Sequence, residues 1–486
     1  MMMLGVSSRA ACARFAGALA AGEAARQSST ETPAHCEQAL RRRMTAIGKF
    51  SLLSETAAAP SVPAVLLTLR GPEIGADRIR SLLLEKIVPA SPRFRSRVDA
   101  TALEFVDDLG ERGAPPVLDG APGAPLPKAV AEVLSTPLAG ARGGDAPWWE
   151  ATRFPRREGT AILLRAHHCL ADGVSLAALF SRLTDQADEI DAAVAAEVTK
   201  RRRRTGRQAA KWKRLLRKLA RAVGFLFRLV GAALATVRVL ATAKAPLRGA
   251  RLRFPDRAGT RSVAWASRFA TVSSLKRVAK ALGGEAATVN DVYAAVVAGA
   301  LRAVLPGAPS EVACAVPVHL YGGALLPGVA VGNHIGAVVV SLPLPAADGA
   351  DDAGHVARVS ASVGGSLRGG ARAVFAYGAA YAAGALLPRC LVPRAMAMSA
   401  GCATVALTNV RGPPVDALSI DGRPVADVVP FLPPPPGCPV GVALTTIGDD
   451  ATICVNADAG LVDADALLDA ALAYYAALLE RADRAR

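Results

Sequence analysis

Two adjacent histidines, His167 and His168, open the stretch "HHCLADG", which also contains Asp172 and Gly173. An imidazole titrates near neutral pH, so a histidine held at a strand end can take a proton from a hydroxyl and return it to a leaving group. Asp172 lies directly before Gly173, where it is expected in the turn that opens the next helix, orienting the loop. An ordinary helix N-cap is the alternative interpretation of Asp172. The stretch therefore indicates acid–base chemistry at a strand-to-helix turn.

Other uses of the histidine pair need partners that the chain does not place at suitable spacing. Zinc needs three or four ligands, and the other histidines form no such set: they are His35, His319, His334 and His355. The eight cysteines are scattered without a CxxC pair, so neither a zinc ribbon nor a disulfide framework is indicated. A Ser-His-Asp hydrolase remains an alternative in principle, although no G-x-S-x-G elbow occurs. No metal site is predicted, and one packed plus one surface imidazole is the non-catalytic alternative.

The motif needs a strand before it and a helix after it, and the sequence predicts both. Residues 159–166 ("GTAILLRA") are a continuous apolar run typical of a buried strand, and residues 174–190 show leucines at helical spacing. A second series of strands and helices begins at residue 261, with Thr288 as a candidate N-cap for one helix. The predicted fold class is therefore α/β, in two mixed units. Neither unit contains a G-x-G-x-x-G or a Walker loop, which argues against a nucleotide-binding fold.

Composition indicates a folded chain with a sizeable core and a locally concentrated charge. Of 486 residues, 52% are apolar and 20% are charged. The net charge of +16 comes from residues 200–255, which hold 18 Lys or Arg and no Asp or Glu, leaving 39 basic against 41 acidic groups elsewhere. Aromatic residues make up only 5% of the chain, and no nucleic-acid-reading motif accompanies the charge. Nucleic acid is therefore not a predicted partner.

Residues 200–244 begin as a basic block and become strongly apolar after Ala222, with apolar residues three and four apart. This pattern predicts a basic amphipathic helix, for which three interpretations stay open. On a membrane surface, the apolar side chains of residues 225–229 would reach the acyl boundary and the Lys and Arg residues would meet anionic headgroups. Arg228 and Arg238 weaken the case for a transmembrane anchor. A crossover helix packed on the protein's own core is the third interpretation, and it is compatible with membrane contact.

Residues 1–46 are predicted to be an N-terminal extension. The first thirty are rich in Ala, Ser and Arg with a single acid, Glu23, and Arg9 and Arg14 interrupt any apolar core of a secretory signal. An organellar transit peptide and a disordered extension are the two interpretations.

The stretch "HHCLADG" fits the HHxxxDG active-site motif of the CoA-dependent acyltransferase and condensation-domain superfamily. Further blocks occur in a fixed order from about residue 47 to the C-terminus: "FSLLSE" (50–55), "PRFRSRV" (92–98), "STPLAGARGGDAPWWE" (135–150), "TVNDV" (288–292), "PVHLY" (317–321), "GNHIGAVVVSLPL" (332–344) and "LTNVRGPP" (407–414). Any one block is weak, but by the ordered set the chain resembles the bifunctional wax ester synthase/acyl-CoA:diacylglycerol acyltransferases.

This resemblance implies two chloramphenicol-acetyltransferase-like subdomains with mixed sheets and a central tunnel, at residues 47–198 and 255–486, joined by a basic linker at 199–254. It implies an O-acyltransferase that moves a fatty acyl group from acyl-CoA, as substrate and with no further cofactor, to a long-chain alcohol, a diacylglycerol or both. It also implies association with a membrane surface through residues 200–244. In a eukaryotic cell that surface would be the endoplasmic reticulum or a lipid droplet, with a plastid or mitochondrion as the alternative from the N-terminal segment.

By the same resemblance, His168 would be the general base, His167 would position it, and Asp172 would be structural. Gly173 would keep the loop open for substrate. The other implied site residues lie in separate blocks: Glu55 and Asn290 near the site, Asp291 as a helix cap, and Asn409 and Gly412 bordering the tunnel.

Three departures from the family pattern lie outside the histidine pair. Pro147-Trp148-Trp149 stands where the family usually has "PLW", and Tyr321 stands where it usually has a basic residue. Arg411 replaces a proline and adds a charge that could meet a phosphate of CoA. Two alternative functions stay open: a condensation-type acyltransferase with another acceptor, and a catalytically silent lipid-binding relative.

Overall fold

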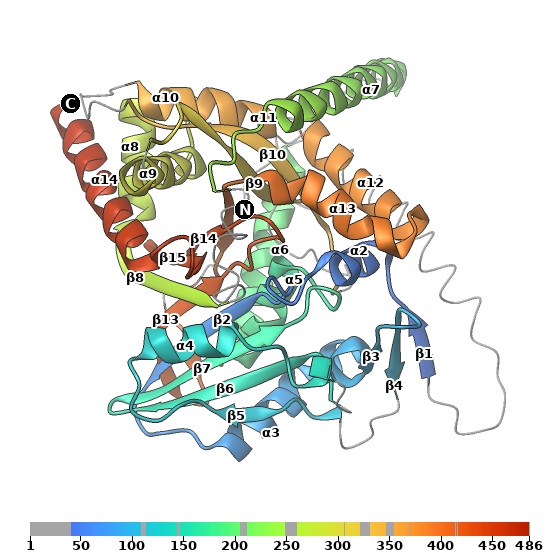
Figure 1. Cartoon of the computed structure of the whole chain (residues 1–486), viewed down its shortest axis with the longest axis vertical. Helices are drawn as coiled ribbons and strands as arrows, with labels where there is room; N and C mark the ends of the chain where they lie inside the picture. The colour runs from blue at the N-terminus through green and yellow to red at the C-terminus, as the bar shows by residue number, and fades with distance from the viewer. Residues whose placement is uncertain are drawn as a thin grey trace.

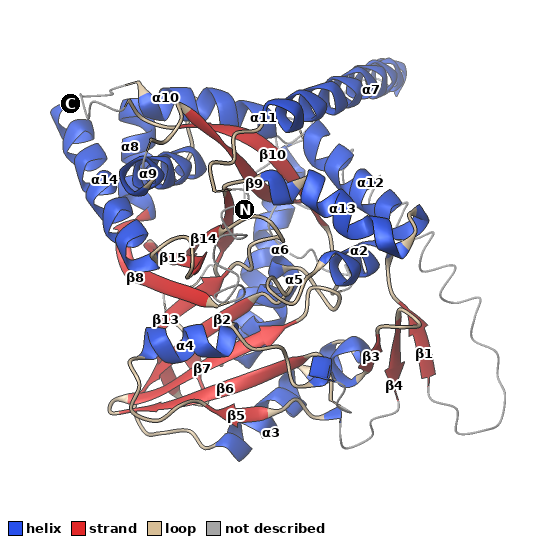
Figure 2. Cartoon of the chain, viewed as in Figure 1, coloured by secondary structure: helices blue, strands red, loops and turns tan. Residues whose placement is uncertain are grey.

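Two six-stranded mixed sheets and one three-stranded sheet form the frame of the protein (Figures 1 and 2). The computed structural model describes residues 40–107, 113–142, 146–204, 211–247, 260–305, 307–320, 331–346, 354–368, 370–413, 415 and 417–485. Tyr321 and residues 1–39 of the expected extension lie outside the described residues.

The first large sheet has the strand order β12-β13-β2-β7-β6-β5. Its strands are β2 (Ala64–Arg70), β5 (Val117–Asp119), β6 (Trp149–Arg156), β7 (Gly159–Ala166), β12 (Ser419–Ile420) and β13 (Arg423–Phe431). All eight residues of β7 are buried, because both faces of the sheet are covered. Helices pack on one face, and one helix together with part of the second sheet packs on the other. Leu164 packs with α3 (Ala76–Lys86) and α5 (Gly173–Phe180), whereas Leu163 packs with α4 (Leu126–Leu134). This two-sided burial explains the continuous apolar run.

The second large sheet has the order β10-β9-β11-β14-β15-β8. Its strands are β8 (Arg261–Thr271), β9 (Glu311–His319), β10 (Ile335–Pro343), β11 (Val405–Arg411), β14 (Val440–Ile447) and β15 (Asp450–Asp458). The helices of this unit are α8 (Val272–Gly283), α9 (Val289–Val304), α10 (His355–Val359), α11 (Gly365–Leu367), α12 (Ala371–Leu386), α13 (Val392–Met398) and α14 (Ala464–Arg484). Buried residues of α8, α9, α12 and α14 join those of the sheet in the largest apolar cluster. The α/β class with mixed sheets is confirmed.

The folded part of the chain begins earlier than the predicted extension of residues 1–46 allows. Strand β1 (Leu40–Arg43) pairs antiparallel with β4 (Glu104–Asp107), which also pairs with β3 (Arg97–Asp99). Met44 is buried next to these strands, and α2 (Ala46–Ser54) follows with Thr45 as its N-cap. Residues 40–46 therefore belong to the fold.

Strand β13 crosses from the second unit to the first. It pairs antiparallel with residues 64–69 of β2. The long strands before and after it in the sequence, β11 and β14, both belong to the second sheet. The segment 255–486 therefore supplies strands to both large sheets, and the two units are tied together by backbone hydrogen bonds rather than by a linker alone.

The helix predicted at residues 174–190 is broken in the structure. Helix α5 ends at Phe180, a 3₁₀ turn covers Ser181–Leu183, and α6 begins at Ala187 and runs to Arg204. The Thr184 hydroxyl donates to the Ser181 carbonyl oxygen (2.6 Å), and the Asp185 amide donates to the Ser419 carbonyl oxygen (2.8 Å). These hydrogen bonds replace the helical ladder at this point.

The basic segment contains one long helix, α7 (Lys211–Thr242), which projects at the edge of the molecule in Figure 1. Along part of its length it packs against α12 and β10, and Ala232 is buried there. None of the described helices combines the length and apolar character that crossing a membrane requires.

Candidate active site

The loop that leaves β7 carries both histidines, and backbone hydrogen bonds hold it on two sides. The His167 amide donates to the Trp148 carbonyl oxygen (2.9 Å), and the His168 amide donates to the Ser61 carbonyl oxygen (2.8 Å). The two side chains then take different environments: His167 is 1% exposed, whereas His168 is partly exposed and lines a cavity. One imidazole is internal, and the other is accessible to a ligand.

His167 is held by Glu55, the C-cap residue that follows α2. Glu55 Oε2 lies 2.9 Å from His167 Nε2, and the Cys169 amide donates to His167 Nδ1 (3.0 Å). Because Nδ1 accepts a hydrogen bond, the ring proton is assigned to Nε2, where it faces the carboxylate. Burial opposes charge on Glu55, but His167 and the Ser61 amide hold the pKa of this carboxyl below its usual value. Glu55 thereby fixes the orientation and tautomer of His167.

His168 is suited to accept a proton. Burial lowers the pKa of its imidazole below the ordinary value; the charge of Asp172 opposes this effect, and the neighbouring His167 adds to it. A lowered pKa keeps the ring neutral at physiological pH, which is the form that acts as a base. The amide group of Asn333 donates to the His168 carbonyl oxygen (2.6 Å) and so fixes the backbone that carries the ring.

Asp172 ties the motif loop to the second unit. Its side chain is fully buried, and Oδ1 caps α5 by accepting from the amides of Val174 (3.1 Å) and Ser175 (2.8 Å). Oδ2 accepts from the His334 amide (2.6 Å), and the Asp172 amide donates to the Gly332 carbonyl oxygen (2.9 Å). The carboxylate therefore acts as an N-cap and as a cross-link between units at once.

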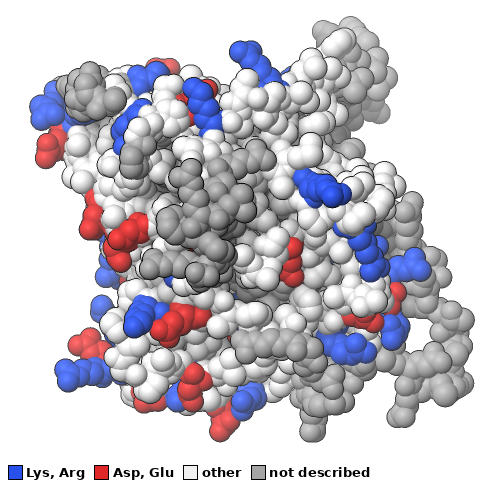
Figure 3. Space-filling model, viewed as in Figure 1, with Lys and Arg blue, Asp and Glu red and all other residues white. Residues whose placement is uncertain are grey.

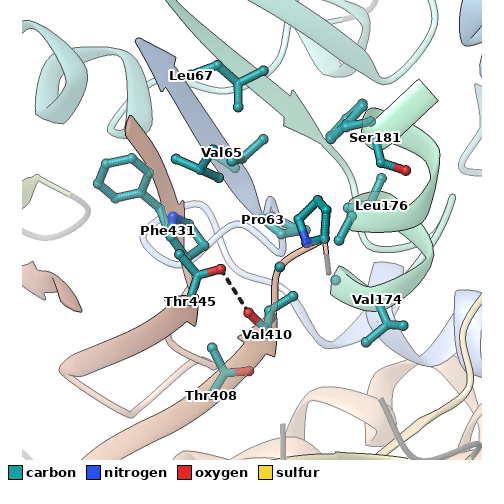
Figure 4. Close-up of a pocket in the computed structure, with 18 of the residues that line it drawn as sticks. Pro63, Val65, Leu67, Val174, Leu176, Ser181, Thr408, Val410, Phe431 and Thr445 are labelled. Atoms are coloured by element: carbon teal, nitrogen blue, oxygen red, sulfur yellow. Dashed lines mark hydrogen bonds between the residues drawn. The ribbon is translucent and has the colours of Figure 1, made fainter. Parts of the chain in front are cut away.

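A cavity of about 160 Å³ lies between the two units with His168 in its wall. The first unit contributes β2 and α5, and the second contributes β11 and β14, as Figure 4 shows with Val65, Leu176, Val410 and Thr445. Among the described residues of the lining, none is Asp, Glu, Lys or Arg. The hydroxyl of Thr445 donates to the Val410 carbonyl oxygen (2.8 Å) and thus offers the cavity little polarity. His168 is the titratable group of this apolar wall.

Two glycines of the predicted site line the same cavity. A Cβ added at Gly173 would meet only Val410, at 3.9 Å, so this position leaves open space at the start of α5. A Cβ at Gly412 would lie 2.0 Å from the Thr446 carbonyl oxygen, so the chain can pass β14 here only as glycine. Gly173 keeps space for a ligand, and Gly412 allows a close backbone approach.

The structure brings Asn290 and Asn409 together, but on a different face. The Asn409 amide group donates to Asn290 Oδ1 (2.7 Å). Asn409 lies between Thr408 and Val410, which line the cavity, so its side chain points to the opposite face of β11. Asp291 completes the capping box of α9: its Oδ2 accepts from the amide of Thr288 (2.8 Å) and from its hydroxyl (2.9 Å).

The block "GNHIG" contributes residues that sequence reasoning did not single out. Asn333 holds the His168 carbonyl and the His334 amide binds Asp172, so this block closes the loop from the second unit. His319 is also buried here, with Nε2 3.8 Å from Asp172 Oδ2, and burial lowers its pKa to about 4. No short-range sequence pattern links residues 333 and 168. The sequence feature that could have indicated the role of Asn333 is the position of "GNHIG" among the ordered family blocks.

The described residues include no group of three or more His, Cys, Asp or Glu side chains placed to hold a metal ion. The arrangement they do form is a neutral imidazole at an uncharged wall, with a second, carboxylate-bound imidazole behind it. Such a site can accept a proton from a hydroxyl group carried by an apolar molecule.

Solved structures with the same fold include a wax ester synthase/diacylglycerol acyltransferase and condensation domains. The wax ester synthase/diacylglycerol acyltransferase from Marinobacter aquaeolei VT8 aligns with a TM-score of 0.56 and 18% identity, over 90% of this chain and 98% of that chain. The condensation domain of the monacolin K polyketide synthase aligns with a TM-score of 0.54 and 13% identity, over 91% and 97%. The first condensation domain of the calcium-dependent antibiotic synthetase gives 0.53 and 18%, over 92% and 97%. At these identities the likeness shows the fold.

Family membership comes from the sequence itself. No curated protein matches the chain. Residues 121–293 match the wax ester synthase/diacylglycerol acyltransferase catalytic domain, and residues 331–478 match the WS/DGAT C-terminal domain. The two matches together cover about two thirds of the chain. The chain therefore belongs to the wax ester synthase/diacylglycerol acyltransferase family and is an acyltransferase.

Proposed function

We propose that the protein transfers a fatty acyl group from acyl-CoA to the hydroxyl of a long-chain alcohol or a diacylglycerol, with His168 as general base. The imidazole takes the hydroxyl proton while the oxygen bonds to the thioester carbonyl carbon. The carbon–sulfur bond then breaks, and the departing thiolate receives the proton from the imidazolium. An ester and free CoA result. The observation that carries the proposal is a neutral His168 in the wall of an uncharged, apolar cavity.

The lining of the cavity supports a lipid acceptor. A long alkyl chain needs an apolar wall without buried charges, because each methylene removed from water contributes about 0.8 kcal/mol. Leu67, Leu176, Phe180, Val428 and Phe431 supply such a wall around His168. A polar or charged acceptor would leave its own groups without partners there.

The supports around His168 suit repeated proton transfer. Glu55 holds His167 and Asn333 holds the His168 backbone, so the base keeps its position through both transfers.

For the acyl-CoA donor, Arg411 is exposed at the end of β11, between the lining residues Val410 and Gly412. Its charge suits a phosphate of CoA outside the apolar cavity.

We also propose that α7 lies on a membrane surface from which lipid substrates are drawn. Its outward side carries an apolar stripe of Phe227 (73% exposed), Val230 (55%), Leu234 (68%) and Val237 (63%). These residues are three or four apart and so lie on one face of the helix. The opposite side packs on the protein through Ala232. The organelle remains a prediction from the N-terminal segment.

A competition assay tests the reaction. The purified protein receives one long-chain acyl-CoA together with a fatty alcohol and a diacylglycerol, and the products are separated by mass. We expect wax ester, triacylglycerol or both, with release of CoA thiol in equal amount. CoA release with neither ester would contradict the proposed acceptors, and transfer to an amine would instead support a condensation-type reaction.

A further inference from the structure

The corner formed by the end of α12 and by α13 exposes four large apolar side chains. Six consecutive residues, Leu386–Leu391 ("LLPRCL"), are all exposed. Leu386 is 79% exposed, and Met398 at the end of α13 is 70% exposed. Several exposed large apolar side chains gathered on one part of the surface mark a contact surface in a folded protein. We call Leu386, Leu387, Leu391 and Met398 the apolar corner.

The corner is a built feature, because its inner side is firmly packed. Gly384 lies so close to α2 that an added Cβ would be 1.9 Å from the Ala46 carbonyl oxygen. Val392 of α13 is fully buried, and Met396 packs on the small apolar cluster around Ala400. The helices therefore present Leu386 and Met398 outward from a fixed backbone.

The charge around the corner has one sign. Residues 353–415 contain six Arg and no Asp or Glu, and two of these, Arg389 and Arg394, are exposed within the corner. The neighbouring helix α2 adds Lys49, and the acid at its C-cap, Glu55, is bound to His167 in the active site. In Figure 3 the surface over α12 and α13 is mostly white with blue groups. Exposed leucine and methionine side chains suit the acyl chains of a membrane, and the arginines beside them suit its anionic headgroups.

The corner also adjoins the surface already assigned to lipid. Helix α12 packs against α7. In Figure 1, α7, α12 and α13 lie on the same side of the molecule. The segment that contains α7 likewise has no acid between residues 200 and 255.

We infer that the apolar corner is a second membrane-contact site, which inserts Leu386 and Met398 into an anionic phospholipid surface while α7 lies along it. This inference rests on the proposed membrane association and adds a site to it. Since α12 and α13 pack on α2, whose C-cap Glu55 holds His167, the contact places the bilayer beside the helix that supports the active site.

Vesicle flotation of the full chain tests the inference. The probe is vesicles of equimolar phosphatidylcholine and phosphatidylserine. The variants are Leu386→Glu, Met398→Glu and the double α7 variant Leu234→Glu/Val237→Glu. Leu118→Glu is the matched control, because Leu118 is exposed (43%) on β5 in the first sheet. Each side chain is exposed, so the substitutions spare the core.

We expect each corner variant and the α7 variant to weaken vesicle binding about tenfold or more, with Leu118→Glu unchanged. If the corner variants bind like Leu118→Glu while the α7 variant is weakened, the second site is wrong and the role of α7 stands. If the α7 variant also binds like the control, the proposed association through α7 fails as well. A corner variant that changes the oligomeric state in light scattering, with vesicle binding intact, would make the corner a contact between copies and overturn the inference.

Discussion

Replacing Asp172 with Ala should destabilise the protein more than the loss of a helix cap alone. The substitution removes the N-cap of α5, which costs about 1–2 kcal/mol. It also leaves the His334 amide without its acceptor in a partly buried place, which costs about 1–3 kcal/mol. The expected decrease in the free energy of unfolding is therefore about 2–5 kcal/mol. Activity should fall too, because the loop that carries His168 loses one of its ties to the second unit.

The matched control is Asp463→Ala. Asp463 is the N-cap of α14 and accepts from the amides of Asp465 (2.9 Å) and Ala466 (3.4 Å), but its site is exposed and it makes no cross-link of the Asp172 kind. Urea denaturation of both variants should show a loss of about 1 kcal/mol for Asp463→Ala and a clearly larger loss for Asp172→Ala. Equal losses would refute the cross-link between the units.

Three further predictions concern the site. Since burial lowers the pKa of His168 and the base must be neutral, kcat/KM should fall only as pH drops below about 6.5, which a pH–rate profile measures. Asn333→Ala removes the amide that holds the His168 carbonyl, so kcat should fall about tenfold, as steady-state kinetics would show. Val428→Trp narrows the cavity and should raise KM for a long-chain alcohol more than for a short one, which a chain-length series measures.

Local signals predicted the elements that carry the motif. Strand β7 occupies residues 159–166 as predicted, because burial on both faces demands a continuous apolar run. Helix α9 begins after Thr288, whose capping box with Asp291 is visible in the sequence as a Thr followed three residues later by an acid.

Contacts between distant residues account for what the sequence did not predict. The break between α5 and α6 depends on Ser419, which binds Asp185 and Gln186 from more than 200 positions away. Strand β13 joins the first sheet through β2, and its own sequence favours neither sheet. Asn333 reaches the motif only because β10 follows it in the second sheet, so its role depends on the tertiary fold.

Removal of the proton from a lipid hydroxyl by His168 can be measured through the rate of ester formation. Initial rates of ester formation from acyl-CoA and a fatty alcohol are compared for the wild-type protein and His168→Ala, with the folded state of both checked by thermal unfolding. A positioned general base contributes about 10²–10⁴-fold, so the variant should lose at least 100-fold while remaining folded. A folded His168→Ala variant with a rate within a few-fold of wild type would contradict the role of His168 as general base.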